Sequence, residues 1–268
     1  MSLSRRIDEA RQAFSRGDLR AAAAAHEPGR IAHGAREEHG GAGAAYIGEM
    51  VYGGLDGIIT TFAVVSGVAG AKLGSGVVVI LGVANLLADG FSMATGAYLS
   101  SKSQREYYDR ERQREAWEVD HFPEGEKAEL RELYLRQGYS EEDARQMVEI
   151  KSRDRERWVD AMMKEELGML PDESHPLANG AATLASFVVA GSVPLLVYLY
   201  GIFVPVAQQV AFGVSVVLSA LALFALGAAR VVVTRQSPAK SGLEMLLVGG
   251  LAAVVAYGVG ALLKGLGA

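Results

Sequence analysis

Long apolar stretches alternate with polar ones along the chain, and their lengths predict helices that cross a membrane. A helix needs about 20 apolar residues to span the hydrocarbon core of a bilayer. Short connections at 71–75 and 201–205 predict two helical hairpins, one formed by the first two helices and one by the third and fourth. We predict five transmembrane helices, near residues 46–70, 76–100, 178–200, 206–229 and 242–264.

A charged segment, residues 102–173, separates the second apolar stretch from the third. We expect the second helix to run past Tyr98 to about Val119, because neither Gly nor Pro interrupts the sequence there. Pro and Ser suit helix starts and Gly suits helix ends. We therefore expect two more helices in this segment, from Pro123 to Gly138 and from Ser140 to Gly168.

The predicted fold is an all-α membrane protein with five transmembrane helices and a three-helix cytoplasmic insert between the second and the third. Lys and Arg are frequent in the insert and in the connection before the fifth helix (Arg230, Arg235, Lys240), which places both in the cytoplasm together with the N-terminus. The predicted domains are a flexible cytoplasmic leader (1–45), transmembrane helices one and two (46–100), the insert (101–175) and transmembrane helices three to five (176–268).

The amino-acid composition limits the partners and the metal ligands that the chain can offer. The net charge of −5 and the mixing of acidic with basic residues give no reason to expect a nucleic-acid partner. The 268 residues include no Cys, so disulfides and thiolate sites are excluded, while carboxylate, imidazole and thioether ligands remain. The leader contains His26, His33 and His39, which we interpret as part of a flexible segment or, alternatively, as a metal-binding tail.

Ionisable residues inside a membrane are costly and mark candidate functional sites. Asp56 lies in the first span, and Asp89 lies in the second. Helical spacing puts Asn85, Asp89 and Met93 on one stripe, and Glu49 with Asp56 on another, so facing stripes would line a transport pathway. The alternative is that the two aspartates only hydrogen-bond neighbouring helices. Met93 beside a carboxylate suits a transition metal, although Met also packs against lipid.

The insert carries a second candidate site. Glu115 and Glu118 are three residues apart, and Glu126 and Glu129 repeat this spacing. Together with Met162, Met163 and Glu166 they would offer oxygen and sulfur ligands to Fe²⁺, Mn²⁺, Co²⁺ or Zn²⁺ rather than to alkaline-earth ions. The alternative is that these glutamates form solvated helix faces, paired with the nearby Arg112, Arg114 and Arg131.

From about Tyr46 to its end the chain resembles the vacuolar iron transporter family, as a bacterial-type member. The resemblance is carried by the run YGGLDG from Tyr52 to Gly57, the run ANLLADGFSMA from Ala84 to Ala94, the acidic insert and the five spans. It implies a homodimer whose first two spans line a shared path through Asp56 and Met93. It also implies that the glutamates and methionines of the insert bind metal, and that Fe²⁺ leaves the cytoplasm in exchange for protons.

The sequence departs from the family pattern in two places. Asn85 is neutral where an acidic residue of the path is expected, and the leader has no counterpart in the family. The leader also lacks the paired Glu-x-x-His ligands of a ferritin-like bundle, so ferroxidase activity is not predicted.

We expect a metal exporter and not an enzyme, since no nucleophile and base are in register and no organic cofactor is implied. The metal ion is the substrate, and protons and membrane lipid are the other partners. The alternative hypothesis is a membrane-anchored metal sensor or buffer without transport. The Ala-, Gly- and Arg-rich composition favours a bacterial cytoplasmic membrane.

Overall fold

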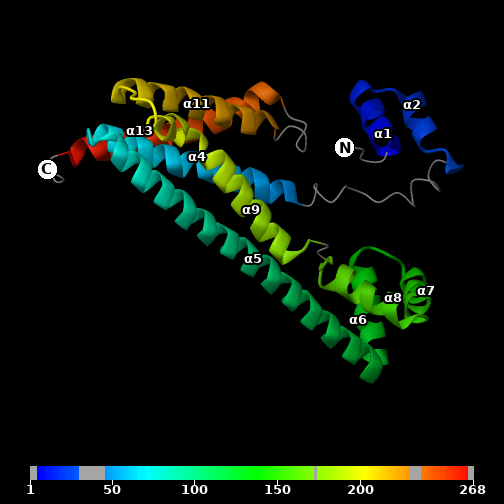
Figure 1. Ribbon diagram of the computed structural model, residues 1–268. Helices are drawn as coiled ribbons and strands as arrows, with labels where there is room; N and C mark the ends of the chain where they lie inside the picture. Colours follow the sequence, from blue (N-terminus) through cyan, green and yellow to red (C-terminus); the bar gives the residue numbers. More distant parts are fainter. Residues whose placement is uncertain (1–4, 30–45, 172–173, 230–236, 265–268) are drawn as a thin grey trace. The chain divides into compact units, whose positions relative to one another are not determined.

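The computed structural model describes residues 5–29, 46–171, 174–229 and 237–264, and all regular structure within these ranges is helical (Figure 1). The chain forms two compact units. The membrane unit comprises residues 1–97 and 177–268, and the insert unit comprises residues 98–176. Arg230 and Arg235, on which part of the predicted orientation rests, lie outside the described residues.

Within the described residues, five helices are long and apolar enough to cross a membrane, as the apolar stretches predict. The second span and the extension expected beyond it form one continuous helix, which ends two residues beyond the expected Val119 (Figure 1). The five spans begin and end as follows: α4 (Ile47–Gly70), α5 (Ser75–His121), the segment Pro176–Tyr200, α11 (Gln208–Ala229) and α13 (Pro238–Leu262).

The third span is not one regular helix, which differs from the prediction. It consists of α9 (Pro176–Gly191), a 3₁₀ turn (Val193–Leu195) and α10 (Leu196–Tyr200). Pro194 lies in the turn, and because proline lacks a backbone N–H it cannot continue the α-helical hydrogen bonds. The carbonyl oxygen of Pro194 instead accepts a hydrogen bond from the buried Ser215 hydroxyl of α11 at 2.7 Å.

Glycines let α4 and α9 approach each other closely. A methyl group at Gly57 would lie 2.5 Å from the carbonyl oxygen of Phe187, and one at Gly191 would lie 2.8 Å from the carbonyl oxygen of Gly57. The residues around this contact, including Phe62, Val65 and Phe187, form the core of the membrane unit. The glycine beside Asp56 therefore serves helix packing, and its carbonyl faces α9.

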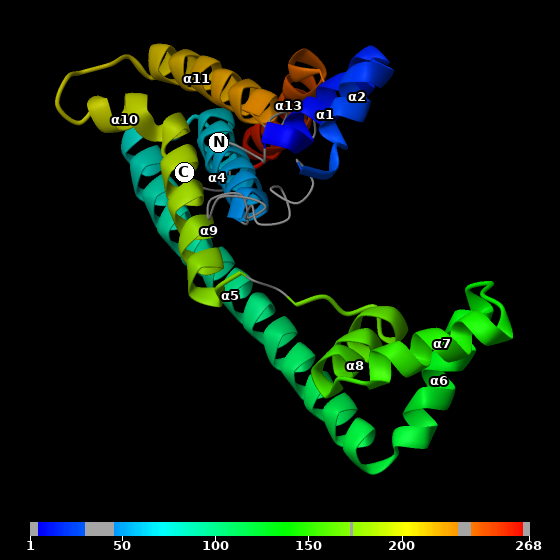
Figure 2. The same cartoon turned by 90° about the vertical axis from the view of Figure 1, so that its right-hand side faces the viewer.

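The insert unit contains the end of α5, then α6 (Pro123–Arg136), α7 (Glu141–Ser152), α8 (Arg155–Ala161) and a π-helical turn (Met162–Glu166) (Figure 2). The positive φ angles of Gly138 and Gly168, +95° and +64°, suit the chain reversals expected at these glycines. The prediction of a single helix from Ser140 to Gly168 is wrong. It divides because the Asp154 side chain accepts a hydrogen bond from the Arg157 amide and starts a new helix.

A buried core and ion pairs hold the insert unit together. Leu130, Tyr134 and Trp158 belong to a cluster of buried side chains that joins α6 to α8. Arg112 of α5 hydrogen-bonds Asp160 at 2.5 Å and Glu156 at 2.8 Å. These contacts fix the last turns of α5 against α8, so the glutamates at the end of α5 occupy a defined position.

The first half of the leader contains two short helices. Its described residues form α1 (Arg5–Arg16) and α2 (Leu19–Ala25). Asp18 caps α2 by accepting hydrogen bonds from the amides of Arg20 and Ala21, and alanine is the best helix former. His33 and His39 lie outside the described residues.

Candidate metal centre

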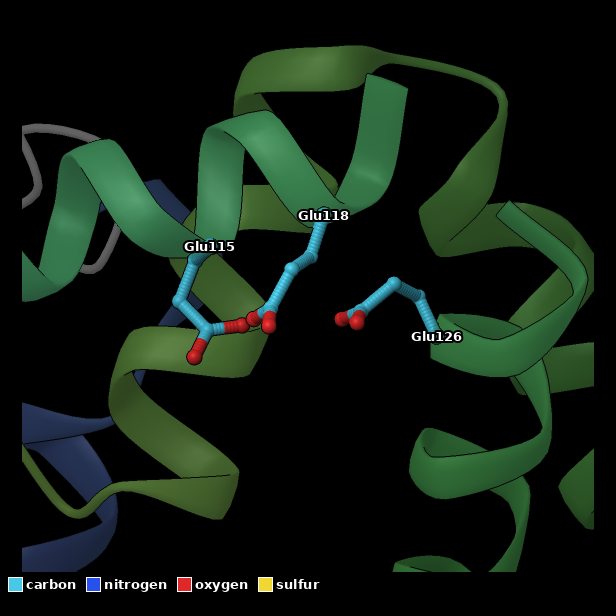
Figure 3. A group of neighbouring side chains, drawn as sticks. All are labelled: Glu115, Glu118 and Glu126. Atoms are coloured by element: carbon cyan, nitrogen blue, oxygen red, sulfur yellow. The ribbon is translucent and has the colours of Figure 1, made fainter. Parts of the chain in front are cut away.

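Three glutamates of the insert unit meet where α5 ends and α6 begins. One carboxylate oxygen from each of Glu115, Glu118 and Glu126 lies within 4.8 Å of the other two. The side chains of Glu115 and Glu118 project from α5 towards that of Glu126 on α6 (Figure 3). The helix reversal at Phe122 and Pro123 creates this meeting, since α6 starts with Pro at its first position directly after α5.

Burial makes this group of carboxylates unusual. Glu115 is 1% exposed and Glu126 is 4% exposed. The pKa of both residues is raised to about 7, first by burial, and for Glu126 the neighbouring carboxylates of Glu115 and Glu129 contribute to this shift. One carboxylate oxygen of Glu126 is buried without a hydrogen-bond partner among the described residues. Buried acceptors of this kind are satisfied by a proton or by a cation.

Arg114 is the basic residue in contact with these glutamates. Its guanidinium donates hydrogen bonds to Glu115 at 2.5 Å, to Glu118 at 2.5 Å and to Glu111 at 3.0 Å. The other two arginines considered as partners bind elsewhere, Arg112 to α8 and Arg131 to Glu141. The simple interpretation of these glutamates as partners for arginine therefore holds in part, for Glu115 and Glu118, and does not account for Glu126.

Glu129 and Glu166 border the same carboxylates. Both residues are exposed, yet the pKa of Glu166 is raised by burial of its carboxyl group and then by the charge of Glu129. The charges of Glu166 and Glu129 likewise raise the pKa of Glu115. The neighbouring Glu165 points to a different partner, because it forms an ion pair with Lys151.

Met162 and Met163 are both completely buried in the core of the insert unit, beside residues such as Leu130 and Trp158. They open the π-helical turn that ends at Glu166. π-Helical turns are rare and are frequent at functional sites. The turn thus links the two thioethers to a carboxylate of the candidate centre, while burial alone also agrees with an ordinary role in the core.

The candidate pathway residues lie in the membrane unit. Glu49 and Asp56 are half-buried on α4, and Asn85 and Asp89 are half-buried on α5. The amide nitrogen of Asn85 is buried without a hydrogen-bond partner among the described residues, and Met93 packs against the membrane core.

Comparison with known proteins connects this arrangement to one family. The model of the VIT family matches residues 47–261. The chain is similar to a vacuolar iron transporter of Toxoplasma gondii, with 37% identity over 97% of this chain and 89% of that protein. A vacuolar iron transporter of Plasmodium berghei shows 34% identity, with 97% of both chains covered. Vacuolar iron transporter 1 of Eucalyptus grandis shows 34% identity over 88% of this chain and 93% of that protein.

These relatives come from apicomplexans and a plant, so they do not support the expectation of a bacterial-type member. The match extends across all five apolar helices and the insert between them, which identifies an integral membrane protein. The match of the family model over most of the chain and the identities of the relatives show that the chain belongs to the VIT family.

Proposed function

We propose that this protein transports a divalent transition metal, Fe²⁺ and also Mn²⁺, across a membrane and away from the cytoplasm. The observation that carries the proposal is the group formed by the buried Glu115 and Glu126 with the half-buried Glu118. It occurs in a chain that aligns over 97% of its length with proteins named vacuolar iron transporters. Buried carboxylates that converge in this way are suited to hold a cation that passes through.

The proposed metal centre consists of these three glutamates with Glu129, Glu166, Met162 and Met163. Carboxylate oxygens bind most divalent ions, whereas thioether sulfur favours softer transition metals over Mg²⁺ and Ca²⁺. The mixed set of donors fits Fe²⁺ and Mn²⁺, and it also accommodates Co²⁺ and Zn²⁺. We propose that the insert lies in the cytoplasm and collects the ion there, an orientation supported by its many Lys and Arg residues.

The proposed pathway runs through the first two spans. Asp56 lies on α4 and Asp89 lies on α5, and Glu49, Asn85 and Met93 add polar or sulfur groups to the same two helices. We propose that two copies of the chain pair and that α4 and α5 of each line a shared path. Paired carboxylates inside a bilayer are expensive, and a passing cation would offset their repulsion.

Proton exchange follows from the chemistry of carboxylate ligands. A carboxylate binds metal only when it is ionised, so protons and metal ions compete for the same oxygens. On the acidic side of the membrane, protonation of the pathway acids would release the ion. The returning protonated carboxylates would then carry protons to the cytoplasmic side, which gives exchange of metal for protons.

The test is metal uptake into liposomes that contain the purified protein and have an acidic interior. Metal-sensitive and pH-sensitive dyes inside the liposomes would record both ions after addition of Fe²⁺ under anaerobic conditions. We expect metal entry that is faster with the gradient and that makes the interior more alkaline. If the rate of metal entry does not depend on the pH gradient, proton exchange is contradicted. If metal enters no faster than it enters liposomes without protein, transport is contradicted.

A membrane-anchored metal sensor or buffer is the competing function. Its support is the compactness of the insert unit, residues 98–176, which could bind ions without help from the spans. The two functions differ in what they require of Asp56. A sensor or buffer retains metal binding and all metal-dependent behaviour in Asp56→Ala, whereas a transporter with this pathway retains binding and loses uptake.

A further inference from the structure

Arg114 holds two of the proposed metal ligands at the same time. Its Nη2 donates to Glu115 Oε1 and its Nη1 donates to Glu118 Oε2, both at 2.5 Å. Hydrogen bonds between a guanidinium and carboxylates are short and strong because both partners are charged. The guanidinium thus occupies one oxygen of each carboxylate, and its positive charge lies where it would repel a metal ion that binds these two glutamates.

The same side chain has a third partner outside the group of ligands. Nε of Arg114 donates to Glu111 Oε2 at 3.0 Å, one helical turn before Glu115. Glu111 also pairs with Arg110, and its pKa is held below the ordinary value, first by its hydrogen bond to Arg114. Glu111 is thus an ionised partner that remains available when Glu115 and Glu118 bind something else.

Arg114 also has room to move. Its side chain is 44% exposed, whereas that of Glu115 is 2% exposed. An exposed arginine has many rotamers, so it can leave the two carboxylates and stay in contact with Glu111 without any change in the helix. The buried side chain of Glu115, in contrast, is held by its surroundings, while that of Glu118 is 28% exposed.

We propose that Arg114 is a built-in competitor of the metal ion, which occupies Glu115 and Glu118 until metal displaces it towards Glu111. This inference rests on the proposed function, because it assigns a role at the same metal centre. Metal binding must break the hydrogen bonds from the guanidinium to Glu115 and Glu118, which lowers the affinity for the metal ion. When the guanidinium binds these carboxylates again, it favours release of the metal ion. A centre that collects ions for transport gains from this competition, since a site that binds too tightly does not pass its ion on.

The inference predicts opposite effects for two substitutions. Arg114→Gln removes the competitor and keeps a polar side chain, so the affinity for metal rises about tenfold, the equivalent of a hydrogen bond to a charged group. Glu111→Gln removes the partner that receives the displaced guanidinium, so the affinity falls severalfold. In the double variant Arg114→Gln/Glu111→Gln, the second substitution does not change the metal affinity further, because no guanidinium remains that could pair with residue 111.

The experiment is calorimetric titration of the full-length protein in detergent with Mn²⁺ at fixed pH. Arg136→Gln is the matched control, because it removes one positive charge from α6 where the arginine pairs with Glu132. We expect this control to bind Mn²⁺ like the unmodified protein, which separates competition at the ligands from a general change in charge. If Arg114→Gln does not fold, Arg114→Lys and Glu111→Gln decide the question, with tighter binding expected for the first and weaker binding for the second.

The outcomes separate this inference from the function on which it rests. If the unmodified protein binds Mn²⁺ and Arg114→Gln binds it more weakly, Arg114 supports the ligands and the inference is overturned while the metal centre stands. The inference is also overturned if Glu111→Gln changes the affinity for Mn²⁺ by the same factor in the unmodified protein and in Arg114→Gln. If the unmodified protein shows no saturable binding of Mn²⁺, the proposed metal centre fails and the inference fails with it.

Discussion

Glu115 at the end of α5 and Glu126 at the start of α6 place carboxylate oxygens within 4.8 Å of each other, although both residues are buried. Two buried carboxylates at such a separation repel unless a proton or a cation compensates their charge. We therefore expect metal binding at this pair to depend on pH.

Metal affinity should fall steeply as the pH drops through neutrality. The pKa values of Glu115 and Glu126 are raised to about 7, so both carboxyl groups take up protons well above the ordinary value of 4.5. Each proton that must leave for metal to bind lowers the affinity by about tenfold for each unit of pH below the pKa. Titrations with Mn²⁺ at several pH values would show this slope. A pH-independent affinity between about pH 6 and about pH 8 would contradict the participation of these residues.

Glu126→Gln should weaken metal binding strongly. The amide keeps the shape of the side chain but lacks the negative charge, and we expect a loss of at least about tenfold in affinity. Glu132→Gln is the matched control, because Glu132 lies on the same helix and pairs with the exposed Arg136. Equal affinities of the two variants, measured by titration with Mn²⁺, would remove Glu126 from the metal centre.

Gly57→Ala should destabilise the packing of α4 against α9. The added methyl group would lie 2.5 Å from the carbonyl oxygen of Phe187, so the backbones must separate, at a cost of about 1–3 kcal/mol. Gly48→Ala is the control, because a methyl group there meets no atom within 4 Å. Thermal unfolding in detergent should show a lower midpoint for the first variant alone. Identical midpoints would mean that the close approach of the two helices is not required.

Asp154→Ala should loosen α8 through loss of its N-terminal cap. The Asp154 side chain accepts the hydrogen bond of the Arg157 amide, and removal of such a cap costs about 1 kcal/mol. Hydrogen exchange of the amides in Arg155–Ala161 should accelerate severalfold. Glu149→Ala, which removes an exposed ion pair with Arg153, should leave these amides unchanged. Exchange that is unaffected by Asp154→Ala would show that the break between α7 and α8 does not depend on the cap.

The sequence alone predicts the spans and the long helix well, for a simple physical reason. The need for about 20 apolar residues defines a transmembrane helix, and the absence of Gly and Pro after Leu99 predicts that α5 continues into the insert. Local interruptions are harder to predict. Pro194 interrupts the third span because it lacks a backbone N–H, and Asp154 starts a new helix within the insert through one side-chain hydrogen bond.

The candidate site was predictable as a set of residues but not as a geometry. The three-residue spacing of Glu115 and Glu118 places them on one face of a helix, whereas their meeting with Glu126 depends on how α6 folds back at Phe122. The sequence does not show which of Arg112, Arg114 and Arg131 contacts the glutamates of the site. Only its contacts distinguish Arg114, because Arg112 binds α8 and Arg131 binds Glu141.

Uptake of Fe²⁺ into liposomes by the unmodified protein, Glu126→Gln and Asp56→Ala tests the central claim most directly. We predict that Glu126→Gln loses uptake at low concentrations of metal and recovers part of it at high concentrations, because the centre only collects the ion. We also predict that Asp56→Ala binds metal normally and transports almost none at any concentration. Uptake by Asp56→Ala equal to that of the unmodified protein would contradict a metal pathway through the first two spans.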